Sequence, residues 1–456
     1  MTTRTAVRRS PKEGPEKGGE WPATSEDVES ISQRLAEAPW LRENRLQALS
    51  AYRAFPMPNT SEEAWRRTDL RSFPGSALHD FAADEGDVDP ALLGTTGPVK
   101  LGPQLLVRPG HATQRRGQDE LARQGVVFAD WATAVRENDI LLREYLGSVV
   151  SPQDGKFAAL ASAMASVGVV LYVPPGVNLD EPLHSVLWAP GAGKAFFGRV
   201  LVILDQGASA TLIHETASPT EPEGQTFHSG IVELAVREGA RLTFVEVQNW
   251  GEHVWNFTHE RAKVHLDGHL DWAFGAIGSH LTKNFTDLDL VGRGAVGRMS
   301  GFYIVDGVQH LDHDTQQNHL APDTTSDLLF KGALLGRSRS VWQGMIYVAP
   351  GAQKTDGYQA NRNLVLSPQA RADSIPGLEI LADDVRCTHG ATVGRLEEEP
   401  VYYLMSRGLP RKEAERLAVD AFFAPIMERV PSETVRMRFQ HMIDEKLGMP
   451  GAVHAE

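Results

Sequence analysis

A turn that recurs about every thirty residues is the feature that most limits the folds open to this chain. Turns of similar appearance occur in "LDQGASATL", "VREGARLTF", "HLDGHLDWAF", "VGRGAVGRMSGFY" and "LSPQARADSI". The steps between Gly207, Gly239, Gly268 and Gly294 are 32, 29 and 26 residues. Short β-type runs flank each turn, so this period predicts a coil of stacked strands.

The strands themselves look buried on both sides. Runs such as "RVLVILD" are apolar at consecutive positions, as in the strands of a parallel sheet. We therefore expect a β-helix, or a related elongated β-sandwich, from about residue 157 to about residue 393. A jelly roll of the cupin type is the alternative.

The segments on either side of this core carry helical periodicity. Apolar residues recur at three- and four-residue spacing at Val28, Ile31 and Leu35, and again at Ala414 and Leu417. The chain is thus predicted to be mainly β with flanking helices. The predicted parts are a disordered tail (1–20), an N-terminal helical domain (21–150), a β core (151–394) and a C-terminal helical domain (395–456).

Composition narrows the function classes. The formal charge of −14 argues against nucleic acid as the main partner, because phosphate binding needs a concentrated basic face. The single cysteine excludes an internal disulfide. The sequence also contains no 18-residue apolar run of the kind that spans a membrane. We expect a cytoplasmic protein that binds neither nucleic acid nor membranes.

The single cysteine lies in "DDVRCTHGATVG", two positions before a histidine. On a strand, Cys387 and His389 share a face with their Cα atoms roughly 6.6 Å apart, so both could bind one metal ion. The competing interpretation is a buried, inert thiol, because cysteine is among the most buried residue types. An iron–sulfur cluster normally takes four thiolate or imidazole ligands. A metal site here therefore predicts an interface with a second chain.

The segment "HLDHDTQQNH" is a second candidate site. On a strand, His313 and His319 share one face and His310 lies on the other. A cupin-like metal-dependent enzyme that uses these three histidines is the alternative function, against polar residues that merely line a sheet face or an interface. A carbohydrate-cleaving β-helix is a third interpretation, although adjacent Asp383 and Asp384 could not flank one glycosidic bond.

Several longer segments resemble the SufD proteins of the SufB/SufD family, which belong to the SUF iron–sulfur cluster assembly scaffold. The chain is similar to SufD rather than SufB because it has one cysteine, and His389 is followed by Gly390 where SufB has glutamate. The resemblance rests on "EEAWRRTDL" (62–70), "KFAALASAM…GVVLYVPPGV" (156–177), "KTDGYQANRNLVLSPQARADSIPGLEI" (354–380), "DDVRCTHGATVG" (383–394) and "FFAPIMERV" (422–430).

The resemblance implies a right-handed parallel β-helix core between N-terminal and C-terminal helical domains. It also implies a heterodimer with SufB through the β-helix, a SufC ATPase docked on the C-terminal helical domain, and a homodimer as an alternative for the isolated chain. His389 matches the family's functional histidine, which would help to hold a nascent cluster at the SufB–SufD boundary, and Cys387 matches the adjacent cysteine. Such a subunit is non-catalytic: it shares transient iron or an iron–sulfur cluster with its partner and carries no cofactor alone.

Overall fold

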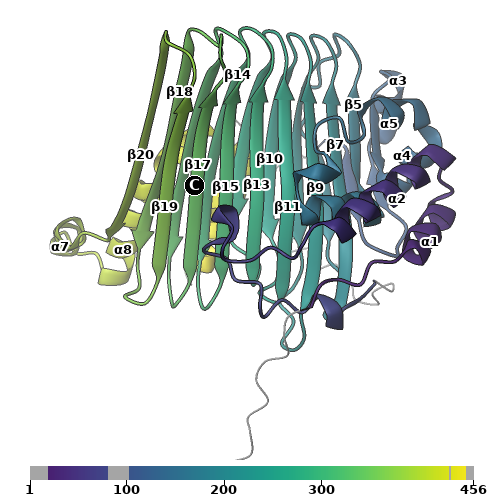
Figure 1. The fold of residues 1–456 in the computed structure, drawn as a ribbon. Coiled ribbons are helices and arrows are strands. Elements are labelled where there is room, and N and C mark those ends of the chain that lie inside the picture. Colours follow the sequence, from purple (N-terminus) through teal and green to yellow (C-terminus); the bar gives the residue numbers. More distant parts are fainter. Residues whose placement is uncertain (1–18, 81–101, 431–432, 448–456) are drawn as a thin grey trace, which may run out of the picture.

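Two long parallel sheets lie face to face and form a β-helix (Figure 1). The computed structural model describes residues 19–80, 102–430 and 433–447, so most of the predicted tail (1–20) lies outside the described residues. Successive strands alternate between the two sheets, so each coil of the chain contributes one strand to each sheet. The predicted fold class, mainly β with flanking helices around a parallel β-helix, is confirmed. The jelly-roll alternative is wrong.

Within each sheet, the strands of successive coils are parallel, and each residue pairs with the residue directly opposite it in the next coil. Sheet A contains β5 (Val167–Val173), β7 (Lys194–Leu204), β9 (Thr226–Val236), β11 (Val254–Val264), β13 (Leu281–Leu290), β15 (His310–His319), β17 (Arg339–Val348) and β19 (Arg371–Ile380). Sheet B contains β6 (Leu183–Trp188), β8 (Ser209–Ala217), β10 (Arg241–Asn249), β12 (His269–Ala276), β14 (Val296–Val305), β16 (Thr325–Leu334), β18 (Thr355–Val365) and β20 (Val385–Arg395).

The two ends of the β-helix differ. At the N-terminal end, β4 (Val127–Asp130) runs antiparallel to β5, and β3 (Gln114–Arg116) runs antiparallel to β2 (Gln104–Val107), which pairs with β6. A short strand, β1 (His79–Asp80), pairs with β7. At the other end, β19 and β20 each have one neighbouring strand in the part of the chain that is described. The β-helix is therefore capped at its start and open at its end.

The recurring turn has a backbone explanation. In seven of the turns where the chain passes from sheet A to sheet B, one residue has φ between 49° and 71°, the left-handed region. Its N–H donates to a backbone carbonyl of the next coil's turn at 2.6–3.4 Å. The residues at this position are Gly176, Gly207, Gly239, Asp267, Gly294, Asp323 and Lys354, which lie 31, 32, 28, 27, 29 and 31 residues apart.

The left-handed positions differ from the turn centres that the sequence indicated. The third turn is centred on Asp267 rather than on Gly268, and the last two left-handed positions hold no glycine. The segment "LSPQARADSI" joins β18 to β19 and so lies at the opposite edge of the coils. The spacing between glycines is therefore irregular at turns where the left-handed backbone conformation still recurs regularly.

The N-terminal part of the chain covers the outer face of sheet A. Helix α1 (Ser25–Leu35) begins with a capping box in which Thr24 and Asp27 bond reciprocally to backbone N–H groups. The segment "KFAALASAM" forms helix α6, so the β-type pattern expected from about residue 157 begins at Val167 instead. The helices here are α1, α2 (Pro39–Ala54), α3 (Gln118–Arg123), α4 (Trp131–Glu137), α5 (Asp139–Tyr145) and α6 (Lys156–Met164).

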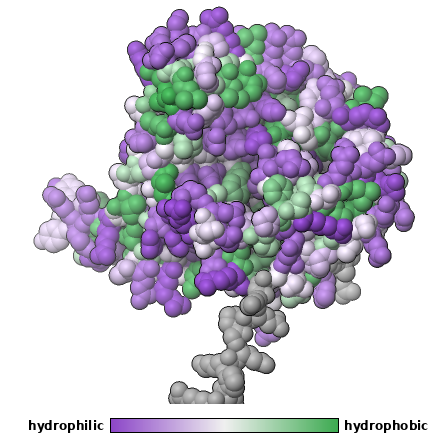
Figure 2. Space-filling model, viewed as in Figure 1, coloured by the Kyte–Doolittle hydropathy of each residue, from purple (hydrophilic) through white to green (hydrophobic). Residues whose placement is uncertain are grey.

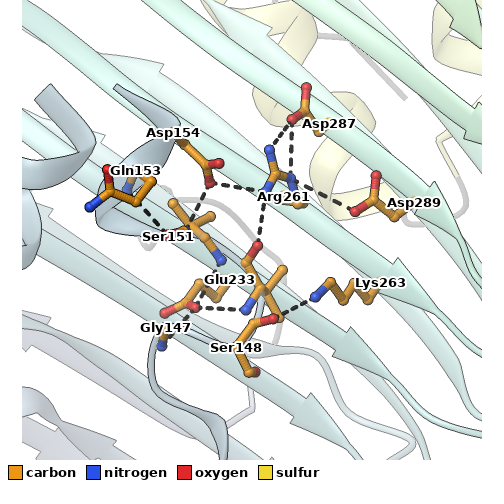
Figure 3. Close-up of polar contacts among 12 residues, drawn as sticks. Gly147, Ser148, Ser151, Gln153, Asp154, Glu233, Arg261, Lys263, Asp287 and Asp289 are labelled. Atoms are coloured by element: carbon orange, nitrogen blue, oxygen red, sulfur yellow. Dashed lines mark hydrogen bonds and ion pairs between the residues drawn. The ribbon is translucent and has the colours of Figure 1, made fainter. Parts of the chain in front are cut away.

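Buried charges fix the loop between α5 and α6 to sheet A (Figure 3). One carboxylate oxygen of the fully buried Glu233 accepts hydrogen bonds from the backbone N–H groups of Gly147 and Val150, both at 3.1 Å. Arg261 reaches the same loop from β11 and bonds Asp154 at 2.9 Å. Glu233 also forms a buried ion pair with Arg199 of β7, and removing one partner from a buried ion pair costs roughly 3–5 kcal/mol. The N-terminal helices are thus attached to the β-helix by specific polar contacts as well as by apolar packing.

The C-terminal helices cover part of the outer face of sheet B. They are α7 (Glu398–Ser406), α8 (Arg411–Arg429) and α9 (Glu433–Lys446). The ring of Phe302 on β14 lies 5.7 Å from that of Phe423 in α8 and 4.8 Å from that of Phe439 in α9. By contrast, α7 lies beyond the last strands, at the left of Figure 1.

Replacing Lys354 with glycine should stabilise the chain by roughly 0.5–1 kcal/mol, because a non-glycine residue is strained in the left-handed conformation. The measurement is the free energy of unfolding in urea. The matched control is Gly239→Ala at the equivalent turn, where an added Cβ would meet no atom within 4 Å. That variant should lose about 1 kcal/mol. A loss of stability in Lys354→Gly would contradict this account of the turn.

Candidate functional site

The last coil of the β-helix, residues 371–395, forms a surface that we call the open end. Among described strands, β20 pairs with β18 alone and β19 with β17 alone, so each sheet presents the backbone groups of an edge strand. Apolar side chains are exposed beside these edges, including Leu381 (51% exposed) and Val393 (50%). Unpaired strand edges together with exposed apolar residues are typical of a surface that another chain covers.

The predicted site residues lie on β20, at the open end. In register, Cys387 pairs with Gly357 of β18 and His389 pairs with Gln359. Cys387 packs against the cluster of Ile346, which faces the interior from sheet A. Because the segment is a strand, His389 faces the same way. Cys387 is half-buried and His389 is exposed, so both side chains line the open end of the interior.

The thiol of Cys387 packs closely against the backbone of Gly357. A Cβ placed on Gly357 would lie 3.2 Å from Cys387 Sγ and 3.3 Å from Nε2 of His319, so a larger residue there would crowd both groups. Burial raises the pKa of the Cys387 thiol above its usual value; a hydrogen bond from the Gly357 N–H opposes this rise, and the charge of Asp356 adds to it. The isolated chain therefore holds a protonated thiol at neutral pH.

The histidines of "HLDHDTQQNH" do not converge. On β15, His313 and His319 face the interior, whereas His310 lies on the outer face, where its Nε2 is 2.9 Å from the hydroxyl of Thr68. Burial lowers the pKa of each of the three histidines to about 4. No group of three His, Cys, Asp or Glu side chains in the described ranges is arranged to hold a metal ion. The cupin-like metal enzyme is therefore not supported.

Paired carboxyl groups do occur, but inside the β-helix. Glu246 and Glu260 are fully buried, and burial raises the pKa of Glu260 to about 7. Asp383 and Asp384 lie in the turn between β19 and β20. A glycosidase needs its two carboxyl groups on opposite sides of a bond that a polysaccharide can bring to them. The buried pair is out of reach of such a substrate.

Comparison with known proteins identifies the family. Residues 187–422 match the family described as SUF system FeS cluster assembly, SufBD core domain. The chain is 31% identical over 425 residues to an iron-sulfur cluster assembly SufBD family protein of Staphylococcus epidermidis, with 90% of each chain covered. It is 29% identical over 428 residues, again with 90% of each covered, to the iron-sulfur cluster assembly protein SufB of Bacillus subtilis. The chain belongs to the SufBD family.

The predicted family is thus confirmed, and with it iron–sulfur cluster assembly as the process in which the chain takes part. The matched region runs from β6 into α8 and includes β20 with Cys387 and His389. Within the described helices, no segment is both long enough and apolar enough to cross a membrane.

The structure also presents a surface that the sequence did not single out. Tyr402 of α7 is 73% exposed, and Tyr403 and Met405 beside it are exposed as well. Most of the molecular face drawn in Figure 2 is hydrophilic, with hydrophobic residues in smaller groups between. Helical periodicity predicted a helix near this point, but it could not show that α7 would lie away from the core. A SufBD chain with this surface has a second region suited to a protein partner.

The pH dependence of Cys387 alkylation tests the environment of the thiol. Iodoacetamide labels the thiolate, and the chain has one cysteine, so the signal reports Cys387 alone. Because the thiol pKa is raised, the rate should be low at pH 7 and still rising above pH 9. Asp356→Asn removes a charge that raises this pKa and should shift the profile to lower pH. A rate that levels off below pH 8 would show that the thiol is not protonated as described.

Proposed function

We propose that this chain is the SufD-type subunit of an iron–sulfur cluster assembly scaffold. It pairs through its open end with a cysteine-bearing SufB-type paralogue and, without being a catalyst itself, helps to hold a nascent cluster where the two chains meet. His389 is the ligand from this chain, with Cys387 beside it. The observation that carries the proposal is the position of both residues on the last described strand, at the uncapped end of the β-helix.

Ligand count explains why a partner is needed. A cluster normally takes four thiolate or imidazole ligands, and this chain has one thiol. Cys387 and His389 can supply two ligands at most, so the partner supplies the others. Iron and sulfur here are the cargo of the complex and not a resident cofactor of this chain.

The open end suits a partner of the same fold. A second β-helix with the same spacing between sheets could place its own last strands against β19 and β20 and continue both sheets by strand addition. The contact would cover the exposed side chains of Leu381 and Val393 and remove His389 from water. A second copy of this chain would meet the same requirements, so the isolated chain would pair with itself when the paralogue is absent.

The C-terminal helices suit the ATPase of the complex, SufC. Tyrosine and methionine are enriched at the centres of protein interfaces, and α7 exposes Tyr402, Tyr403 and Met405 together. Helix α8 leads from this surface to the packing contact between Phe423 and Phe302 on sheet B. Motion of a docked ATPase would therefore reach the β-helix through α8.

A charge placed at the open end tests the pairing. Leu381→Arg should abolish copurification with the SufB-type paralogue, because a guanidinium would be buried without a partner in the interface. The control is Leu266→Arg in the turn before β12, where a leucine is also exposed (40%) but lies away from the open end. Pairing that survives Leu381→Arg at unchanged affinity would rule out this surface.

Loss of the imidazole tests the ligand role. His389→Ala should abolish cluster formation by the complex with the paralogue and the ATPase, measured from the absorbance of the cluster after iron and sulfide are supplied. The fold and the pairing should remain, because His389 is exposed on the last strand. Thr388→Ala, which changes the neighbouring exposed residue on the opposite face of β20, is the control. Normal cluster formation by His389→Ala would eliminate the role.

A further inference from the structure

Two carboxyl groups meet across the interior of the β-helix. Glu246 lies on β10 of sheet B, two positions after the interior residue Phe244, and Glu260 lies on β11 of sheet A, two positions before the interior residue Ala262. Both glutamates are buried, and their side chains are within hydrogen-bonding distance of one another. Glutamate is almost never fully buried unless it is paired, so two that contact each other need an explanation.

One oxygen of each carboxyl group lacks a hydrogen-bond partner among the described residues, namely Oε2 of Glu246 and Oε1 of Glu260. Other hydrogen bonds do reach the pair, from the hydroxyl of Thr286 to Oε2 of Glu260 at 3.0 Å and from Trp272 to Glu246. Two ionised carboxylates can only accept hydrogen bonds, so they cannot satisfy each other. A protonated carboxyl group has one O–H donor, and a single proton between the two groups would therefore pair both oxygens.

The described part of the interior offers this pair no positive charge in place of a proton. The titratable groups on the interior faces of the neighbouring strands are His214, His228 and His313. Burial lowers the pKa of His214 to about 3 and the pKa values of the other two to about 4, so all three are neutral at pH 7. The cations of β13 and β14 lie on outer faces, where Lys283 bonds Asp312 and Arg298 is exposed.

We propose that Glu246 keeps its proton inside the closed β-helix and donates it to Glu260, so that one bound proton joins the two sheets. The chain takes up this proton when the sheets close over the pair and releases it to water when they part. The β-helix thus contains a pH-sensitive element that is separate from the open end.

The effect on stability has a definite sign. Burial raises the pKa of Glu246 well above its usual value, and the charge of Glu260 raises it further. A glutamate in the unfolded chain has a pKa of about 4.3, so at higher pH the unfolded chain releases a proton that the folded chain retains. A difference of one bound proton changes the folding equilibrium about tenfold per pH unit. The folded state therefore loses stability as the pH rises, until it too releases the proton.

Urea unfolding of the full-length chain at pH 7 and at pH 8 tests the proposal. Glu246→Gln has nearly the shape of a protonated glutamate and keeps an N–H donor for Glu260, but it cannot titrate. The unfolding equilibrium constant of the wild type, divided by that of this variant, should rise about tenfold between the two pH values. The same pH dependence in both chains would overturn the proposal.

The matched control is Gln248→Met. Gln248 lies two positions further along the interior face of β10, is also buried, and donates its amide to Thr282 at 3.0 Å. This variant removes a buried polar group without removing a titratable one. Its stability should fall at both pH values, but its pH dependence should remain that of the wild type.

Infrared spectroscopy of the wild-type chain provides a test that requires no variant to fold. At pH 8 the spectrum should contain the C=O absorption of a protonated carboxyl group, although Asp314, whose pKa burial raises to about 6, is ionised there. Absence of this absorption would overturn the proposal. Neither measurement needs a partner or iron, so failure here leaves the proposed assembly function untouched, and failure of the assembly tests leaves the bound proton untouched.

Discussion

Hydrogen bonding between successive coils is the constraint on which the rest of this structure depends. A strand in the stack satisfies its backbone groups only when another strand lies on each side of it. Even the turns obey this rule, because each left-handed residue donates its N–H to the turn of the next coil, ending with Lys354 and the carbonyl of Asp384. At the N-terminal end the antiparallel strands β3 and β4 complete the pattern. Within the described part of the chain, the last coil has no such completion, and the candidate site lies there.

The interior side chains change in character as the end is approached. Along one row of sheet B, the chain places Leu328 on β16, Gln359 on β18 and His389 on β20. An apolar core residue is thus followed by a buried amide and then by an exposed imidazole. The three residues occupy equivalent backbone positions in successive coils, so the site needs no departure from the regular fold. Its chemistry comes from the side chains that the final coils carry and from the absence of a further coil to cover them.

The sequence predicted those features that depend on local pattern. The turn period indicated a β-helix because glycine occupies the left-handed position in four of these seven turns. It became irregular where Asp267, Asp323 and Lys354 occupy that position. Two-residue alternation correctly separated His310 from His313 and His319. It could not show that Gln359 lies beneath His389, because register depends on the lengths of the intervening turns. It also gave no sign that the β-helix is capped at one end and open at the other.

That difference between the ends also limits how far such molecules can assemble. A coil open at both ends could add copies without limit and would grow into a fibre, as heterologous contacts do when they fail to close. Two β-helices joined at their open ends, as proposed above, would turn only their antiparallel caps outward. The stack would then terminate at two chains, and the final coils of both, with any residues between them, would be enclosed at the centre of a finite particle.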